Sequence, residues 1–441
     1  MTPEKNIPHL NPLKSTHMIW KNRKFYPAIG EYLRDHVGGL AIYYLRGRRY
    51  YVTDPELAQK IWRIDYRTAV KPNMPYSTLG VYQGNGLVIS EGPEWVQQRR
   101  WAAPSFLRGE FPRYLEIMQK ETQLLIQEWQ KVAAAGQSLN IVPNLNRATF
   151  RILCHCILGR TLDHQLEGLY HEINQSIILL PRRIFSPVYL PLKYPIPVNV
   201  DLKKSGTKFR KIIGEIVELA RTSETGGMLS YLLKKREIPT GEAVDMLATM
   251  LGAGFETTAN LLSWALFLLG QDQKSQDTLR AELSSLSSGN LNLETLEKSE
   301  FLEAVLNESL RLYPPILVPS RRLTNAIEID GLKFEKDSVF DISIWAIQRD
   351  PKYWKDPDQF IPERFLKANL DPRSLTAFFP FAVGPRECIG KQFAMLEARV
   401  ILALLLSKFR FDLAPGAQVE KESLMVLRPK GGVPMRLSMR P

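Results

Sequence analysis

The chain lacks several features that mark common classes of protein. Its 441 residues include only three cysteines, Cys154, Cys156 and Cys388, which are too few for a disulfide framework and are typical of a reducing compartment. Residues 1–24 contain neither the apolar stretch of a signal peptide nor a run of about 20 apolar residues. The sequence therefore predicts a soluble, cytoplasmic protein without a transmembrane anchor.

Internal repeats, low-complexity tracts and nucleic-acid-binding motifs are also absent. Lys and Arg outnumber Asp and Glu by 58 to 46, so the formal net charge is +12. Because no nucleic-acid motif accompanies this charge, we expect no nucleic-acid partner. The positive charges would attract an acidic protein partner, or they would simply lie on the solvated surface.

Apolar residues recur at helical spacing over most of the chain. We expect a helix over residues 25–37 and another helix that opens at Asp54-Pro55. Most of residues 94–285 should also be helical, apart from a proline-rich stretch at 180–197. Short strands are expected at residues 40–45, 49–52, 328–329, 339–344 and 424–427, and a long loop at residues 70–89. The pattern predicts a mainly α architecture with a small β-rich part.

Two of the cysteines and one histidine fall in an apolar helical run. Cys154, His155 and Cys156 lie within residues 148–158, where Cys154 and Cys156 point to different helix faces. No metal-binding motif includes them, so we expect structural roles for all three.

The third cysteine lies in a loop that directly precedes an apolar helical run at residues 391–409. Residues 381–390 read Phe-Ala-Val-Gly-Pro-Arg-Glu-Cys-Ile-Gly. A thiol at the start of a helix meets unpaired N–H groups and the positive end of the helix dipole, which favour the thiolate. Gly384 and Gly390 would permit turns and close approaches that a side chain would block. Such a thiolate suits an axial iron ligand, although free cysteines are often simply buried.

The longest apolar helical run, at residues 242–269, has an irregular centre with the sequence Ala-Gly-Phe-Glu-Thr-Thr at 253–258. Gly254 weakens the helix there, and the Thr257 hydroxyl can divert a backbone carbonyl. Glu256 in mid-run argues against a transmembrane helix. Alone, this pattern also fits a kinked buried helix with a solvated glutamate.

Glu308 and Arg311 are three residues apart and share one face of a helix. Pro-Glu-Arg-Phe follows at residues 362–365 and supplies Arg364. The spacing is weak by itself, because surface pairs of this kind are frequent.

The pattern Phe-x-x-Gly-x-Arg-x-Cys-x-Gly at 381–390 resembles the haem-binding loop of the cytochrome P-450 family. The segments around Glu256 and Glu308 resemble two other signatures of this family. The resemblance implies one haem domain over residues 1–441 with the cytochrome P-450 fold. Its β-rich part would cover approximately residues 38–70, 312–345 and 410–441.

The resemblance also implies residue roles. Cys388 would ligate the iron of haem b. The loop residues Phe381 and Gly390, and Ala253 on the central helix, would border the haem. Thr257 and Glu256 would organise water and deliver protons to dioxygen. The haem propionates need cationic or hydrogen-bonding partners, for which the candidates are Trp95, Arg99, Arg321 and Arg386. Glu308, Arg311 and Arg364 would form a buried ion network with a structural role.

The function implied is that of a monooxygenase of the soluble bacterial type, which inserts one oxygen atom of O2 into a lipophilic substrate. Electrons would come from a separate ferredoxin or flavodoxin with its reductase, and NAD(P)H would act only through them. Because the chain ends about 50 residues after Cys388, no fused reductase domain is expected. An acidic partner would meet Arg99, Arg100, Arg386 and Lys391. The proline-rich stretch at 180–197 would cap a substrate channel or touch a membrane surface, of which we favour the channel.

Two alternatives stay open. A non-catalytic haem protein would not need the Glu256–Thr257 pair. A peroxide-driven oxidase would not need a proton-relay alcohol.

Overall fold

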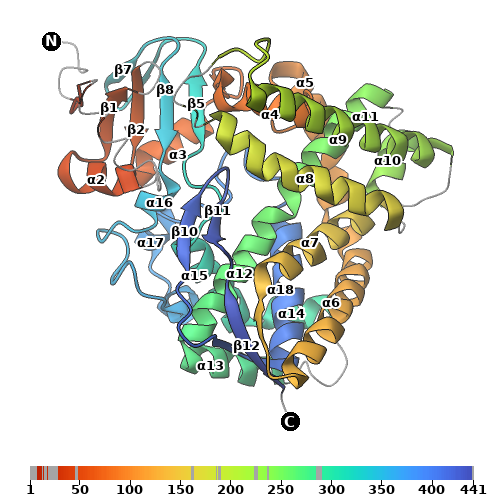
Figure 1. Cartoon of the computed structure of the whole chain (residues 1–441). Coiled ribbons are helices and arrows are strands. Elements are labelled where there is room, and N and C mark those ends of the chain that lie inside the picture. Colours follow the sequence, from red (N-terminus) through yellow and green to blue (C-terminus); the bar gives the residue numbers. More distant parts are fainter. Residues whose placement is uncertain are drawn as a thin grey trace.

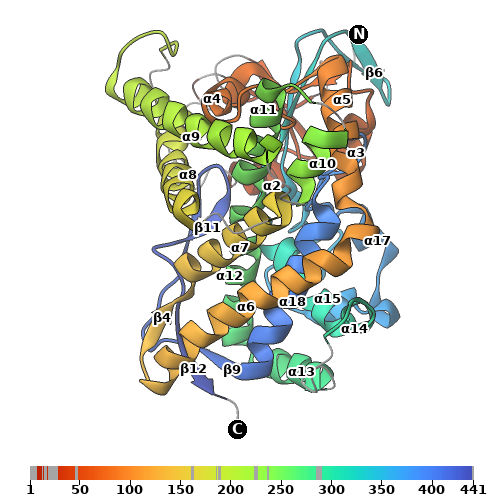
Figure 2. The ribbon, with the colours of Figure 1, turned by 90° about the vertical axis from the view of Figure 1, so that its right-hand side faces the viewer.

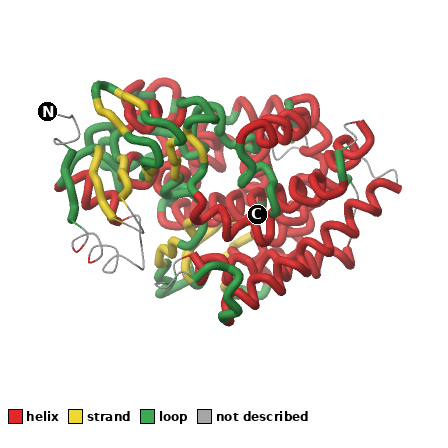
Figure 3. Tube along the Cα trace, turned by 90° about the horizontal axis from the view of Figure 1, so that it is seen from above, coloured by secondary structure: helices red, strands yellow, loops and turns green. Residues whose placement is uncertain are grey.

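The computed structural model describes residues 7–11, 13, 17, 28–44, 48–159, 163–184, 186, 190–222, 227–235, 238–284 and 291–439. Helices form most of the molecule, and the five-stranded sheet lies toward one side (Figure 1). The view from above separates this strand-rich side from the helical side (Figure 3).

The mainly α architecture is confirmed. The helices are α2 (Ala28–His36), α3 (Pro55–Arg63), α4 (Asn73–Gln83), α5 (Gly92–Ala102), α6 (Phe111–Ala134), α7 (Ile141–Leu158), α8 (Asp163–Ile184), α9 (Pro197–Thr222), α10 (Gly227–Lys235), α11 (Thr240–Gly254), α12 (Glu256–Gln271), α13 (Gln273–Leu283), α14 (Leu293–Lys298), α15 (Glu300–Leu312), α16 (Ile344–Ile347), α17 (Pro372–Thr376) and α18 (Lys391–Lys408).

The strands form four small sheets in the described part of the chain. They are β1 (Leu40–Tyr44), β2 (Arg48–Val52), β3 (Ala69–Val70), β4 (Ser138–Asn140), β5 (Ser320–Leu323), β6 (Ile327–Ile329), β7 (Leu332–Phe334), β8 (Val339–Ile342), β9 (Phe409–Leu413), β10 (Glu420–Ser423), β11 (Leu427–Lys430) and β12 (Pro434–Met439). The largest sheet has the order β1-β2-β8-β5-β3, in which only β2 and β8 are parallel.

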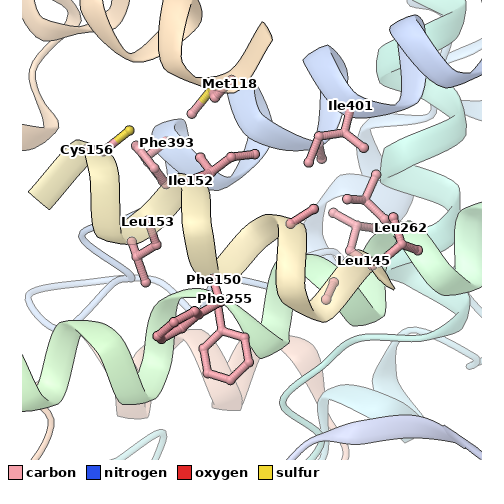
Figure 4. Packing of buried hydrophobic residues seen from close by; sticks show 14 of the residues in the cluster. Met118, Leu145, Phe150, Ile152, Leu153, Cys156, Phe255, Leu262, Phe393 and Ile401 are labelled. Atoms are coloured by element: carbon pink, nitrogen blue, oxygen red, sulfur yellow. The ribbon is translucent and has the colours of Figure 1, made fainter. Parts of the chain in front are cut away.

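Helices α11 and α12 follow each other through the middle of the helical part. α7, α15 and α18 pack against α12, and α6 packs against α7 and α18 (Figure 2). Ile152 of α7, Leu262 of α12 and Ile401 of α18 are completely buried in the same core cluster (Figure 4). Cys154, Cys156 and His155 are buried in α7, as expected, and His155 Nδ1 lies 3.0 Å from Glu121 Oε1.

Four sequence predictions of local structure were wrong in part. Residues 73–83 form α4 rather than a loop, because prolines at a helix start cost no hydrogen bond and Gly84, with φ +56°, ends the helix. Helix α8 continues through Pro181 to Ile184. β8 ends at Ile342, since Ser343 caps α16. The strand expected at 424–427 is mostly the turn between β10 and β11.

The predicted start of the helix at Asp54-Pro55 is confirmed. Asp54 caps α3 by accepting a hydrogen bond from the Leu57 N–H at 2.8 Å, with Pro55 in the first turn. Residues 25–27, 45–47, 185 and 187–189 fall outside the described residues.

The predicted ion network is present and buried. Glu308 accepts two hydrogen bonds from Arg311, at 2.7 and 2.9 Å, and one from Arg364 at 3.0 Å. The side chains of Glu308 and Arg311 are completely buried. Arg311 also donates to the carbonyls of Gln348 and Pro357. The network therefore fixes the irregular segment that leads toward the cysteine loop onto α15.

Replacing Glu308 with Gln should lower the free energy of unfolding by about 3–5 kcal/mol, because two guanidinium groups lose their buried counter-charge. Glu303→Gln is the matched control: it lies on the same helix and pairs with Arg399 at 3.0 Å, but its side chain is 46% exposed. Its loss should stay below about 1 kcal/mol. Denaturant titration measures both values, and equal losses would contradict the role of the buried network.

Candidate functional site

The cysteine loop, residues 381–390, is closed by its own backbone. The Cys388 N–H donates to the Phe381 carbonyl at 3.0 Å, and the Gly390 N–H donates to the Cys388 sulfur. Helix α18 begins at Lys391, as predicted. The thiol therefore has a fixed place at the start of a long buried helix.

The two glycines of the loop differ in their backbone φ and in the space that a side chain would have. Gly384 has φ +83°, and a Cβ there would lie 2.4 Å from the Trp62 carbonyl oxygen, so this position needs glycine. Gly390 has φ −86°, and the nearest atom to an added Cβ is 3.8 Å away on Phe106. The surrounding protein atoms therefore leave room for a Cβ at position 390, and close approach of another group at Gly390 stays a prediction. Ala382, with φ +57°, is the strained non-glycine residue of the loop.

Cys388 has a solvent-exposed surface, while protein atoms surround the rest of the residue and partly desolvate its sulfur. Burial raises its pKa, whereas the Gly390 N–H and the charges of Arg99 and Lys391 oppose that rise. The expected helix-start effect is present, but desolvation outweighs it. A bound metal cation would supply the missing stabilisation, because a coordinating thiol is deprotonated.

Two cations share one carboxylate beside the loop, and a third cation lies near them. Arg386 Nη2 donates to Glu91. Lys71 Nζ lies 3.5 Å from Glu91 Oε1 and donates to the Ser90 carbonyl at 2.6 Å. The charge of Arg321 acts on both Lys71 and Arg386. The cluster, defined as Lys71, Arg321 and Arg386 with Glu91, unites two residues expected from the sequence, Arg321 and Arg386, with two that sequence reasoning missed.

This cation cluster has more positive charge than Glu91 balances. Burial, followed by the repulsion of Arg386, lowers the pKa of Lys71 to about 7. Burial also lowers the pKa of Arg386, whose Nε and Nη1 atoms are buried without a hydrogen-bond partner among the described residues. An anionic ligand such as a carboxylate would complete these interactions.

Trp95 and Arg99 lie on the same helix, α5. The Arg386 guanidinium lies over the Trp95 ring at 4.5 Å from its centroid, and Arg99 lies 5.7 Å from it. Burial lowers the pKa of Arg99, while the charges of Cys388 and Glu387 raise it. Trp95 therefore adjoins the cation cluster, and Arg99 also faces the thiol.

The irregular centre of the long apolar run is a true break between α11 and α12, at Phe255. Thr257 Oγ1 donates to the Ala253 carbonyl at 3.1 Å, which confirms the expected diversion of a backbone group. Thr149 of α7 donates to the Phe255 carbonyl at 3.2 Å. Gly252 and Ala253 are exposed between the buried residues Leu251 and Phe255. Residues next to the break are therefore accessible to solvent.

Glu256 is the first residue of α12. Burial raises its pKa to about 7, and the positive charge of Arg428 on β11 opposes the rise. A carboxyl with such a pKa can take up and release a proton near neutral pH. Across the described residues, no interaction joins Glu256 or Thr257 directly to Cys388; the connection runs through the packing of α12 on α18.

Comparison with known proteins decides the family. The sequence model of Cytochrome P-450 matches residues 16–434. The chain belongs to the cytochrome P-450 family. Within this family it is 29% identical to a mouse leukotriene-B4 omega-hydroxylase 3, over 87% of this chain and 79% of that one. It is 32% identical to an Arabidopsis thaliana cytokinin hydroxylase, over 80% of this chain and 72% of that one.

Solved structures support the same fold. The cytochrome P450DA haem domain superimposes with a TM-score of 0.85 and 22% identity, covering 99% of this chain and 97% of that one. As a cytochrome P-450, the protein is an oxidoreductase of the monooxygenase class with haem b as its cofactor. The enclosed thiol, the exposed helix surface at Gly252 and Ala253, and the unpaired nitrogens of Arg386 fit a group that has a metal centre and two carboxylates.

Among the residues that the structure describes, no helix has both the length and the apolar character needed to cross a membrane.

Replacing Gly384 with Ala should destabilise the cysteine loop, because the new methyl group would meet the Trp62 carbonyl and the residue would keep a positive φ. We expect a loss of about 1–3 kcal/mol in the free energy of unfolding. Gly390→Ala is the control in the same loop and should cost less than about 1 kcal/mol. Denaturant unfolding of both variants checks the contrast, and a larger loss for Gly390→Ala would refute it.

Proposed function

We propose that the protein uses O2 and electrons from a separate partner to hydroxylate or epoxidise a lipophilic substrate, with Cys388 as the iron ligand. The observation that carries this proposal is the fixed place of Cys388 just before α18, in a loop that its own N–H closes by donating to the Phe381 carbonyl at 3.0 Å. The Gly390 N–H and the charge of Arg99 favour its thiolate. These groups would stabilise the thiolate and limit the electron density that it donates to iron. When bound, haem supplies the redox chemistry that activates O2, so that one oxygen atom enters the substrate and the other leaves as water.

The cation cluster would hold the two haem propionates. Arg386 has two buried nitrogens free for such a contact among the described residues, and Lys71 and Arg321 add charge on the same side. Trp95, under the Arg386 guanidinium, would fix its direction. Binding of the propionates would return the pKa of Lys71 toward its ordinary value, since they add the negative charge that the cluster lacks.

Thr257 and Glu256 would deliver protons from the junction of α11 and α12. The Thr257 hydroxyl donates its hydrogen to the Ala253 carbonyl, so the hydroxyl oxygen can still accept a hydrogen bond from a proton donor. Glu256 would replace the protons that are consumed, because its pKa of about 7 keeps both protonation states populated. This acid–alcohol pair favours O2 chemistry over the alternatives of a peroxide-driven oxidase and a non-catalytic haem protein.

The apolar character of the segments that border the site supports a lipophilic substrate. α4, α8, α9 and α11 pack together next to the exposed backbone at Gly252 and Ala253. Their facing side chains are largely apolar and buried, as with Leu79, Leu180 and Met250. Relatives named as hydroxylases of leukotriene B4 and of cytokinins agree with hydroxylation of an organic molecule.

The electron donor would be a ferredoxin or flavodoxin that docks on the basic surface near the cysteine loop. Arg100 is exposed and lines a surface hollow of about 490 Å³ with Tyr66 and Trp101. Lys391 pairs with Glu387 at 2.9 Å and is 44% exposed. Both cations are therefore available to an acidic partner.

Thr257→Ala tests the proton-delivery role. With NAD(P)H, reductase and ferredoxin, product formation should fall about 100-fold while peroxide release rises, because proton supply limits the reaction. Thr257→Ser keeps the hydroxyl and should retain most of the coupling. The ferrous carbon monoxide spectrum should show thiolate ligation in both variants and lose it in Cys388→Ser. Equal coupling in the Ala variant and the wild type would remove the proposed role, and an unaltered Cys388→Ser spectrum would remove the whole proposal.

Charge reversal tests the docking surface. Arg100→Glu combined with Lys391→Glu should weaken ferredoxin binding about tenfold at low salt and flatten its salt dependence. Lys211→Glu on α9, where the side chain is 77% exposed, is the control for net charge and should bind as the wild type does. Surface plasmon resonance at several salt concentrations measures this, and identical binding by all three proteins would rule out this surface.

A further inference from the structure

The turn that ends α4 is fastened to α11, against which α4 packs. Asp245 of α11 accepts a hydrogen bond from the Asn85 N–H at 2.8 Å and another from Arg210 of α9 at 2.6 Å. The Gly86 N–H donates to the Gln83 carbonyl at 3.1 Å and closes the turn. The last residue of α4, Gln83, therefore has a fixed place beside α11.

The Gln83 amide lies against the α11 backbone at Gly252. A Cβ added at Gly252 would be only 2.9 Å from Gln83 Nε2, so the glycine leaves the room that the amide occupies. Gly252 and Ala253 are exposed, whereas Gln83 is 7% exposed. The Ala253 carbonyl accepts the hydrogen bond of the Thr257 hydroxyl. The amide therefore lies at the edge of the accessible surface that precedes the acid–alcohol pair.

Gln83 differs from the other buried glutamines of the described chain, because its side chain forms no hydrogen bond there. Gln98, Gln276 and Gln348 each use both amide atoms, and the two bonds of Gln98 measure 2.8 and 2.9 Å. Gln83 Oε1 is buried and has no partner among the described residues. An unpaired buried amide costs folding free energy and points to a ligand that pairs with it.

A hydroxyl on the same face of α11 is unpaired as well. Thr249 lies three residues before Gly252, so both are on one side of the helix. Thr249 is 3% exposed, and its Oγ1 has no partner within the described part of the chain. A Cβ at Gly86 would overlap this oxygen, so the hydroxyl faces the turn after α4. Two unpaired polar groups thus lie along one seam among apolar residues of α4 and α11 such as Leu79 and Met250.

We propose that Gln83 is a specificity-determining residue: its amide forms hydrogen bonds with a neutral hydroxyl group of an otherwise lipophilic substrate, and Thr249 is a further partner on the same seam. A hydroxyl both donates and accepts, so it can pair with the amide oxygen and with the amide N–H. A carboxylate suits the site less, because its oxygens and Gln83 Oε1 are all acceptors. The inference names the substrate class of the site and rests on the reaction under Proposed function.

The first experiment is calorimetric titration of the haem-loaded protein with pairs of compounds in which a methyl group replaces the hydroxyl. The pairs are phenylbutanol with pentylbenzene, decanol with undecane, and decalol with methyldecalin. Gln83→Met keeps an unbranched side chain without polar atoms. It should weaken the binding of an alcohol that the wild type binds about tenfold, while the affinity for the matching hydrocarbon should change less than about twofold. Gln97→Met, at an exposed position of α5, is the control and should bind both compounds as the wild type does.

Urea unfolding of the same haem-loaded protein without added compound gives a second readout. Gln83→Met removes an amide that has no hydrogen bond to lose, so its unfolding constant should equal that of the wild type or be lower. Gln98→Met is the matched comparison, because Gln98 is 4% exposed and loses two hydrogen bonds. Its unfolding constant should rise about tenfold or more.

Three results would overturn the proposal. The wild type could bind no alcohol of the panel, Gln83→Met could weaken alcohol and hydrocarbon equally, or Gln83→Met could raise the unfolding constant as much as Gln98→Met does. The last result would give the amide a structural role. Failure of the reaction under Proposed function has a different sign, an unaltered spectrum of Cys388→Ser, and the titrations do not depend on that spectrum.

Discussion

A completely buried carboxylate, that of Glu308, holds together the part of the chain on which the thiol depends. Between α16 and α18 the chain has only short helical turns, and its backbone groups need partners that regular structure would otherwise supply. Arg311 provides them by donating to carbonyls of this segment while its charge is met by Glu308. Arg364 joins the same carboxylate from the segment itself. An irregular stretch of chain thereby acquires the rigidity of the helix to which it is tied.

Desolvation disfavours the charged form of three titratable groups that the site depends on. It raises the pKa of Cys388 and of Glu256 and lowers that of Lys71. In each case one or two neighbours of opposite sign offset part of the shift, which leaves the site short of negative charge at the cation cluster and of positive charge at the thiol. A haem, with a cationic iron and two propionates, would match both deficits at once.

Motifs that are contiguous in sequence were predicted well. The cysteine loop and the weakened helix centre near Phe255 each lie within about ten consecutive residues, so their local pattern was enough. The Glu308 network joins Arg311 to Arg364, which is 56 residues from Glu308, and was predicted only through the family resemblance. Lys71 and its partner Glu91 were missed because their importance comes from segments that meet only in the folded chain. A lone lysine before a proline carries no local signal of burial.

Errors in local structure have a similar origin. Helix α4 was taken for a loop since Pro, Gly and Tyr weaken its periodicity, and packing against α8, α9 and α11 decides its conformation. In the cysteine loop the backbone calls for glycine at Gly384, whose φ is +83°, whereas the φ of −86° at Gly390 suits any residue. The motif alone does not separate these two cases.

The interruption at Phe255 has a mechanical consequence. α11 packs against α4 and α9, α12 packs against α15, α18 and β11, and α7 packs against both helices. The Phe255 carbonyl accepts a hydrogen bond of α12 from the Ala259 N–H at 3.0 Å and a second one from the Thr149 hydroxyl of α7 at 3.2 Å. The junction of the two helices is therefore anchored to α7, which holds the angle at which α11 and α12 meet.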